Sequence, residues 1–231
     1  MTELSDPEGS IAETVSPVAV TVTDEIADAI GQACAELAKP GTWWTGAERV
    51  AIAARARALF AERASPPWLR TLPDPPALLG PEIVDIVDRI TLDAGSIDRA
   101  WATGAIQSVG EGRYVELVGL VATTVMLDVH AEGVGVAPLP LPDPIHGEPA
   151  RTLPDGLGHI GAHVRMIHPS PFANVARALS LVPDTNRLFR LVMMPNYSAN
   201  GFEELRWDTP LSRPQVELVA SRVAAMNECF Y

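Results

Sequence analysis

Prolines alternate with other residues over a stretch in the second half of the chain, and this spacing limits the possible folds more than any other feature does. Four stand at every second position and two more follow, namely Pro138, Pro140, Pro142, Pro144, Pro149 and Pro154. Proline fixes φ and lacks a backbone N–H, so such a run excludes a helix and favours a stiff, extended path. We therefore predict an extended connector over 137–156. A ligand for a proline-binding domain is the alternative, but the interleaved Leu and Ile favour packing on the protein itself.

The segments on either side of this connector have helical spacing. Ile26, Ile30, Cys34 and Leu37 recur every three or four residues and form one apolar face, which predicts a helix over 24–38 with Cys34 in the core. Further helices are predicted at 45–63, 81–90, 96–108 with Ser96 as its cap, and 112–132, with other helix starts at Ser170, Pro183 and Ser212. No segment has strand alternation bounded by hairpin turns, so the predicted fold class is all-α.

Composition and charge narrow the class of protein. The chain has 231 residues, 47% of them hydrophobic, and a net charge of −12, which disfavours nucleic-acid binding. The longest apolar run, 117–127, is too short to cross a membrane. The acidic, polar stretch at 1–22 is predicted to be a disordered tail and not a signal peptide. Two cysteines give no disulfide framework, so we expect a cytoplasmic protein.

A short sequence is repeated in the two halves of the chain. Val-Glu-Leu-Val occurs at 115–118 and again at 216–219, each time near the start of a predicted long helix. If the two halves are aligned on this repeat, Asp128 corresponds to Cys229 and His130 corresponds to Tyr231. The repeat predicts two related helical halves, an N-terminal one at 23–136 and a C-terminal one at 157–231, joined by the proline-rich crossover.

The segment "RPQVELVASRVAAMNECFY" resembles the core helix of the alkylhydroperoxidase-D-like, carboxymuconolactone-decarboxylase family. The motif of that family is Glu, eleven residues, Cys, two residues, Cys, three residues and His, and Glu217 and Cys229 match its first two members. The stretches "TWWTGAERVAIAARARALF", "YVELVGLVATTVMLDVH" and "PLPLPDPIHGEPARTLP" resemble the two-lobed, peroxidase-related branch. This resemblance implies two helical lobes of the alkylhydroperoxidase-D-like type, a homo-oligomer, and reduction of hydroperoxides by a cysteine pair.

The sequence departs from the family motif at its end. The second cysteine and the histidine of the motif are missing after Cys229, so we expect the C-terminal lobe to be cut short inside the redox motif. A selenocysteine codon read as a stop would produce such an ending, which makes the protein a selenoprotein candidate, and an intact mass of the native protein would test this. In the N-terminal lobe, Glu116, Asp128 and His130 form a possible degenerate site without a cysteine. A structural role for Glu116, as the partner of an arginine or a backbone amide, is the competing interpretation.

The chemistry that the family implies needs a thiolate and a proton acceptor, for which Cys229 and Glu217 are the candidate catalytic residues. The function we predict is that of a thiol- or selenol-peroxidase-related oxidoreductase, with a hydroperoxide substrate and a thiol reductant as partners. The alternative is a catalytically inactive helical scaffold or small-molecule-binding protein, in which Cys229 is a free cysteine near a frayed end. We expect no cofactor and no metal, because His159 and His163 lack a zinc-binding motif. We also expect apolar surface to remain exposed on the last helix.

Overall fold

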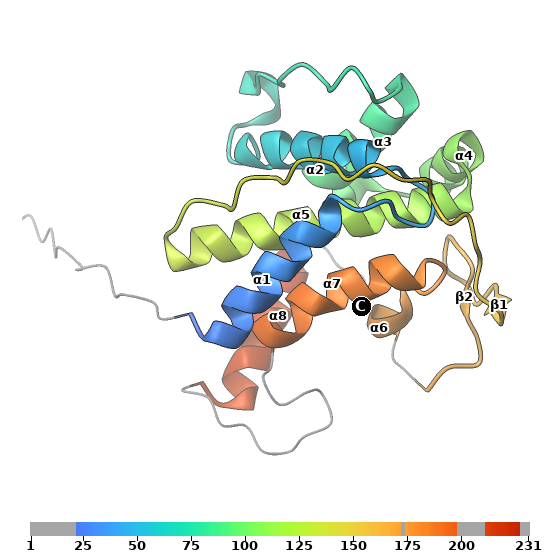
Figure 1. The fold of residues 1–231 in the computed structure, drawn as a ribbon. Helices are drawn as coiled ribbons and strands as arrows, with labels where there is room; N and C mark the ends of the chain where they lie inside the picture. The colour runs from blue at the N-terminus through green and yellow to red at the C-terminus, as the bar shows by residue number, and fades with distance from the viewer. Residues whose placement is uncertain (1–21, 172–173, 198–210, 227–231) are drawn as a thin grey trace, which may run out of the picture.

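The computed structural model describes residues 22–171, 174–197 and 211–226, and within these ranges it is mostly helical (Figure 1). The predicted all-α class is therefore confirmed. The helices are α1 (Asp24–Leu37), α2 (Gly46–Ala61), α3 (Pro81–Leu92), α4 (Arg99–Val109), α5 (Glu111–Val134), α6 (Asn174–Arg177), α7 (Pro183–Tyr197) and α8 (Arg213–Met226). Except for Val22, the predicted tail at 1–22 lies outside the described residues.

Capping residues fix where these helices begin. Thr45 and Glu48 form the predicted capping box of α2, in which each side chain accepts a hydrogen bond from the backbone N–H of the other. The predicted cap of α4 was wrong. Asp98, not Ser96, accepts from Trp101 N at 2.7 Å, and Ser96 instead ends a short 3-10 turn and bonds to Asp93. An aspartate directly before the helix satisfies its first N–H groups better than a serine two residues further away.

A small two-stranded sheet departs from the sequence prediction. Strands β1 (Leu157–Gly158) and β2 (Met166–Ile167) pair antiparallel. Each strand has only two residues, which is too short to show the alternation that identifies a strand in a sequence. The hairpin follows the proline-rich connector and leads into α6.

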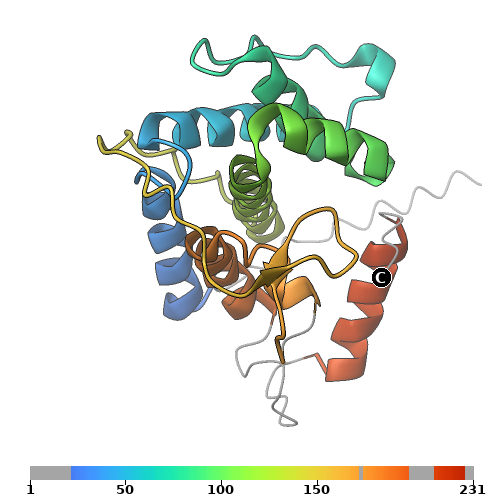
Figure 2. The ribbon, with the colours of Figure 1, turned by 90° about the vertical axis from the view of Figure 1, so that its right-hand side faces the viewer.

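Helix α5 is the centre of the fold. In Figure 2 it is seen nearly end-on, with α2, α3 and α4 on one side of it and α1 and α7 on the other. Its side chains Leu117, Leu120 and Val121 are fully buried, as expected for a helix that has neighbours on most of its surface. Helix α5 is long and apolar enough to cross a membrane, but half of its apolar window is buried inside the fold. That burial is typical of a core helix.

One buried cluster contains side chains from both predicted lobes. Leu188 and Val192 of α7 belong to the same core as Leu37 of α1 and Leu120 of α5. The described residues of α7 therefore pack against the N-terminal helices, between α1 and α5. The division of the chain into two lobes with a crossover at 137–156 remains a prediction.

The proline-rich connector follows an extended path across the surface of α1 and α2 (Figure 1). It is attached by hydrogen bonds at several points: Arg57 Nη1 donates to Leu139 O at 2.7 Å, and Ile145 N donates to Ala38 O at 2.8 Å. Further along, Arg151 N donates to Thr42 O at 2.7 Å. The extended path that its prolines predict is confirmed.

Helix α8 differs from the other long helices because none of its side chains is buried against the described residues. Its exposed apolar side chains are Leu218, Val219, Val223 and Met226. The expectation of exposed apolar surface on this last helix is confirmed for the part of the chain that the structure describes.

Candidate functional site

Glu217, the predicted proton acceptor, lies on the outer helix α8 and is linked to α7. The Tyr197 hydroxyl donates to Glu217 Oε2 at 3.2 Å, and Arg213 Nε lies 3.6 Å from Oε1. The glutamate side chain is 45% exposed. Burial raises the pKa of Tyr197, and the nearby Glu217 carboxylate raises it further, so the phenol keeps its proton and remains a donor to the carboxylate.

Cys229, the predicted nucleophile, lies outside the described residues. Helix α8 carries the chain away from Glu217 as far as Met226, nine residues on, which corresponds to roughly 14 Å of helix. The chain after Met226 must therefore turn back if the Cys229 sulfur is to reach the Glu217 carboxylate.

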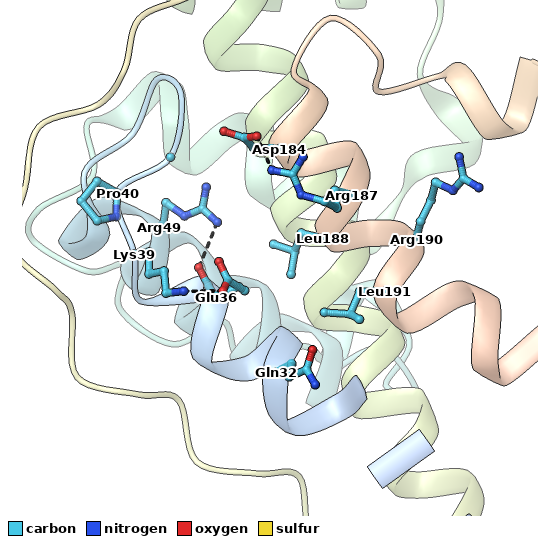
Figure 3. Close-up of a pocket in the computed structure, with 11 residues that line it drawn as sticks. Gln32, Glu36, Lys39, Pro40, Arg49, Asp184, Arg187, Leu188, Arg190 and Leu191 are labelled. Atoms are coloured by element: carbon cyan, nitrogen blue, oxygen red, sulfur yellow. Dashed lines mark hydrogen bonds and ion pairs between the residues drawn. The ribbon is translucent and has the colours of Figure 1, made fainter. Parts of the chain in front are cut away.

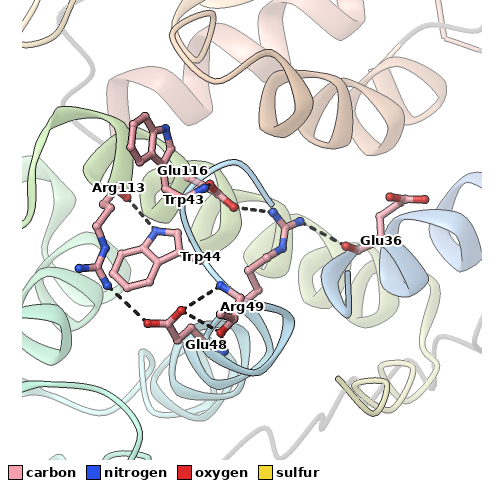
Figure 4. Close-up of polar contacts among 8 residues, drawn as sticks. Glu36, Trp43, Trp44, Glu48, Arg49, Arg113 and Glu116 are labelled. Atoms are coloured by element: carbon pink, nitrogen blue, oxygen red, sulfur yellow. Dashed lines mark hydrogen bonds and ion pairs between the residues drawn. The ribbon is translucent and has the colours of Figure 1, made fainter. Parts of the chain in front are cut away.

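Glu116, the counterpart of Glu217 in the repeat, lies in a very different environment. Its side chain is 0% exposed, and Arg49 Nη1 donates to Oε1 at 2.6 Å (Figure 4). The backbone N–H of Trp43 donates to Oε2 at 2.6 Å. Both partners that the structural interpretation expected, an arginine and a backbone amide, are therefore present.

The loop before α2 packs directly against the buried pair of Glu116 and Arg49. Gly41 lies so close to it that a Cβ at this position would collide with the Glu116 carboxylate and the Arg49 guanidinium. Burial raises the pKa of Glu116, while the Arg49 charge and the Trp43 N–H act in the opposite direction. The second Arg49 nitrogen, Nη2, donates to Glu36 O at 3.2 Å, so the arginine connects α5 to the end of α1.

Asp128 and His130, the other members of the possible degenerate site, do not lie beside Glu116. All three are on the continuous helix α5, where twelve residues separate Glu116 from Asp128, roughly 18 Å along the axis. Asp128 forms an ion pair with Arg57 at 2.8 Å, and His130 Nδ1 lies 2.8 Å from Asn196 Oδ1. The three side chains therefore have separate partners and do not converge on a shared cavity.

Sequence reasoning missed the arginines of α2. Glu48 pairs with Arg113, Arg49 with Glu116 and Arg57 with Asp128, so that ion pairs follow one another along the parallel helices α2 and α5. Arg63, just after the end of α2, pairs with Glu132. Arg55, on another side of α2, pairs with Asp88 of α3 at 2.6 Å. One signal was available in the sequence: α2 is an alanine-rich helix interrupted by arginines, and an arginine buried in such a helix needs a carboxylate partner.

Cys34 is the cysteine that the structure describes, and its predicted place in the core is confirmed. It is buried beside a cavity of about 230 Å³ whose walls include Ala27, Leu127 and His130. Its Sγ donates to Pro140 O at 3.4 Å. Burial raises the pKa of the Cys34 thiol above its usual value, which disfavours the nucleophilic thiolate. Among the residues that the structure describes, no group of three or more His, Cys, Asp or Glu side chains is placed to hold a metal ion.

Comparisons of this chain with protein-family models, with curated proteins and with solved structures find no match. The resemblance to the alkylhydroperoxidase-D-like family therefore depends on the motifs in the sequence itself.

Proposed function

We propose that the protein is an alkylhydroperoxidase-like, thiol- or selenol-peroxidase-related oxidoreductase of the cytoplasm, with Glu217 as its proton acceptor and Cys229 as its redox thiol. The observation that carries the proposal is the position of Glu217. It stands twelve residues before Cys229, and its carboxylate is half-exposed and hydrogen-bonded by Tyr197. A carboxylate in this position is accessible to a thiol, unlike the sealed Glu116.

The chemistry balances with a hydroperoxide and an external thiol. Glu217 takes the proton of the Cys229 thiol, and the thiolate sulfur attacks one peroxide oxygen, which breaks the O–O bond and gives a sulfenic acid. The departing alkoxide receives the proton and leaves as the alcohol. One reductant thiol then displaces water from the sulfenic acid to give a mixed disulfide, and a second releases Cys229 and forms the reductant disulfide.

The test compares the two cysteines. Cys229→Ser should remove the consumption of tert-butyl hydroperoxide in the presence of dithiothreitol, whereas Cys34→Ser should leave it unchanged because that thiol is buried. Glu217→Gln should slow turnover by about 10²-fold or more, the usual contribution of a positioned proton acceptor. Equal activity in wild type and Cys229→Ser would refute the proposal.

The second candidate is a catalytically inactive helical scaffold of the same type. The sealed Arg49–Glu116 pair favours it, because a carboxylate held in this way stabilises the core and has no access to a substrate. In that case peroxide consumption would be absent from wild type, and Cys229→Ser would change neither activity nor the stability of the core.

As part of the peroxidase proposal we also expect a homo-oligomer, since a second copy would cover the exposed apolar side chains of α8. Sedimentation velocity would measure this directly. Val219→Glu, which places a charge on the same side of the helix as Val223 and Met226, should shift the protein to the monomer.

A further inference from the structure

A pocket of about 610 Å³ lies between α1 and α7, closed at one end by the loop that precedes α2 (Figure 3). Its size is in the range of sites for small organic molecules. Helix α1 and the residues just after it contribute Glu36 and Lys39 to the walls, and α2 contributes Arg49. Helix α7 contributes Arg187 and Leu188 from the opposite side. The pocket therefore joins segments that are far apart in the sequence.

The charge of this pocket is opposite to that of the whole protein. Four basic side chains line it, Lys39, Arg49, Arg187 and Arg190, against two carboxylates, Glu36 and Asp184. The chain as a whole has a net charge of −12, whereas the side chains that line the pocket carry more basic than acidic groups. A locally positive cleft in an acidic protein attracts anions.

Two of these cations are available to a ligand at little cost. Lys39 pairs with Glu36, and Arg187 pairs with Asp184 at 2.5 Å, each within a single helix or at its end. All four side chains are well exposed, and exposed pairs of this kind contribute little to the stability of a protein. An anion that enters the pocket can therefore replace the carboxylate partner of either cation.

Arg49 supplies the fixed end of the pocket. It is only 5% exposed and is held by Glu116 and by the carbonyl of Glu36, so it keeps its place without a ligand. Its Nε is buried and has no hydrogen-bond partner among the described residues. The Arg49 guanidinium therefore adds a fixed positive group to the pocket wall, with its charge shared with the buried Glu116 carboxylate.

Apart from Gln32, the rest of the wall is apolar. Leu188 and Leu191 of α7 face α1 across the pocket, and Pro40 closes one side (Figure 3). An ion such as acetate or sulfate would satisfy the rim cations but would leave the exposed parts of Leu191 and Pro40 in contact with water. A molecule with one charged end and an apolar body fits both parts of the pocket.

We infer that the pocket between α1 and α7 binds a small organic anion with an apolar body, of which a medium-chain carboxylate is the simplest example. Lys39 and Arg187 contact the carboxylate at the rim, and Leu188 and Leu191 contact the alkyl chain. This binding site goes beyond the peroxidase proposal and does not depend on it, because it uses neither Cys229 nor Glu217.

The test is isothermal titration of the full chain with octanoate, 1-octanol and acetate, without peroxide or reductant. Octanoate should bind with a Kd on the order of 1 mM or lower. Octanol, which lacks the charge, and acetate, which lacks the apolar body, should each bind at least about tenfold more weakly. Added salt should weaken the binding of octanoate, because the rim cations are exposed.

A variant with both Lys39→Gln and Arg187→Gln should raise the Kd for octanoate about thirtyfold, since it removes two exposed charges that contact the carboxylate. Arg89→Gln is the matched control, because it removes a similar exposed pair with Asp93 on α3, which does not line the pocket. Circular dichroism verifies that each variant is folded. Octanol binding as tightly as octanoate in the wild type, or an unchanged Kd in the double variant, would overturn the inference.

Discussion

The same four residues, Val-Glu-Leu-Val, lie in the centre of the core on α5 and at the surface on α8. On α5, Leu117 is fully buried and Glu116 is sealed against Arg49. On α8, Leu218 is 71% exposed, and the partners of the Glu217 carboxylate among the described residues are Tyr197 and Arg213. The difference comes from the neighbours, because α5 has helices on several sides and α8 buries no side chain. A local sequence specifies a helix, and the surrounding elements decide what its residues do.

The largest expected difference between the two regions is in their glutamates. Glu116→Gln should lower the free energy of unfolding by about 3–5 kcal/mol, because it leaves the buried Arg49 without its carboxylate. Glu217→Gln should lower it by less than about 1 kcal/mol, because its partners are half-exposed. Urea denaturation followed by far-UV circular dichroism measures both. Equal losses would contradict the contrast between α5 and α8.

A double variant sharpens this comparison. The double variant Arg49→Met with Glu116→Leu replaces the whole pair with apolar residues. It should lower the free energy of unfolding much less than Glu116→Gln alone does, because no buried charge is left unpaired. If the double variant is as unstable as the single one, the cost comes from packing around Gly41 and not from the unpaired charge.

The leucines of the repeat give the next largest contrast. Leu117→Ala should lower the free energy of unfolding by about 2–5 kcal/mol, because it opens a cavity beside the fully buried side chains of the core. Leu218→Ala should change the stability by no more than about 0.5 kcal/mol in the monomer. The same denaturation experiment at low protein concentration measures the pair, and a large loss for Leu218→Ala would show that α8 is covered in solution.

Local rules were enough to predict most of the helices and the extended connector. The start of α2 followed from Thr45 and Glu48, and the core position of Cys34 followed from the spacing of apolar residues. The two-residue strands were missed because they are too short for a pattern, and the cap of α4 was assigned to the wrong residue.

The candidate sites were less predictable because their contacts join distant parts of the chain. Arg49 and Glu116 are separated by 67 residues, and no local pattern in the sequence matches one arginine to one acid. The link between Tyr197 and Glu217 and the pocket between α1 and α7 depend on how whole helices pack. The repeat did predict that Glu116 and Glu217 occupy equivalent helix positions, but it did not reveal their opposite surroundings.

The connector at 137–156 has a consequence for the solubility of the protein. An extended segment on a surface usually presents unpaired N–H groups on which another chain can add a strand. Here every second residue from Pro138 to Pro144 has no N–H at all, and the carbonyls of Leu139 and Pro140 are already bonded to Arg57 and Cys34. The segment covers two helices and still gives a neighbouring molecule no continuous edge for β-aggregation.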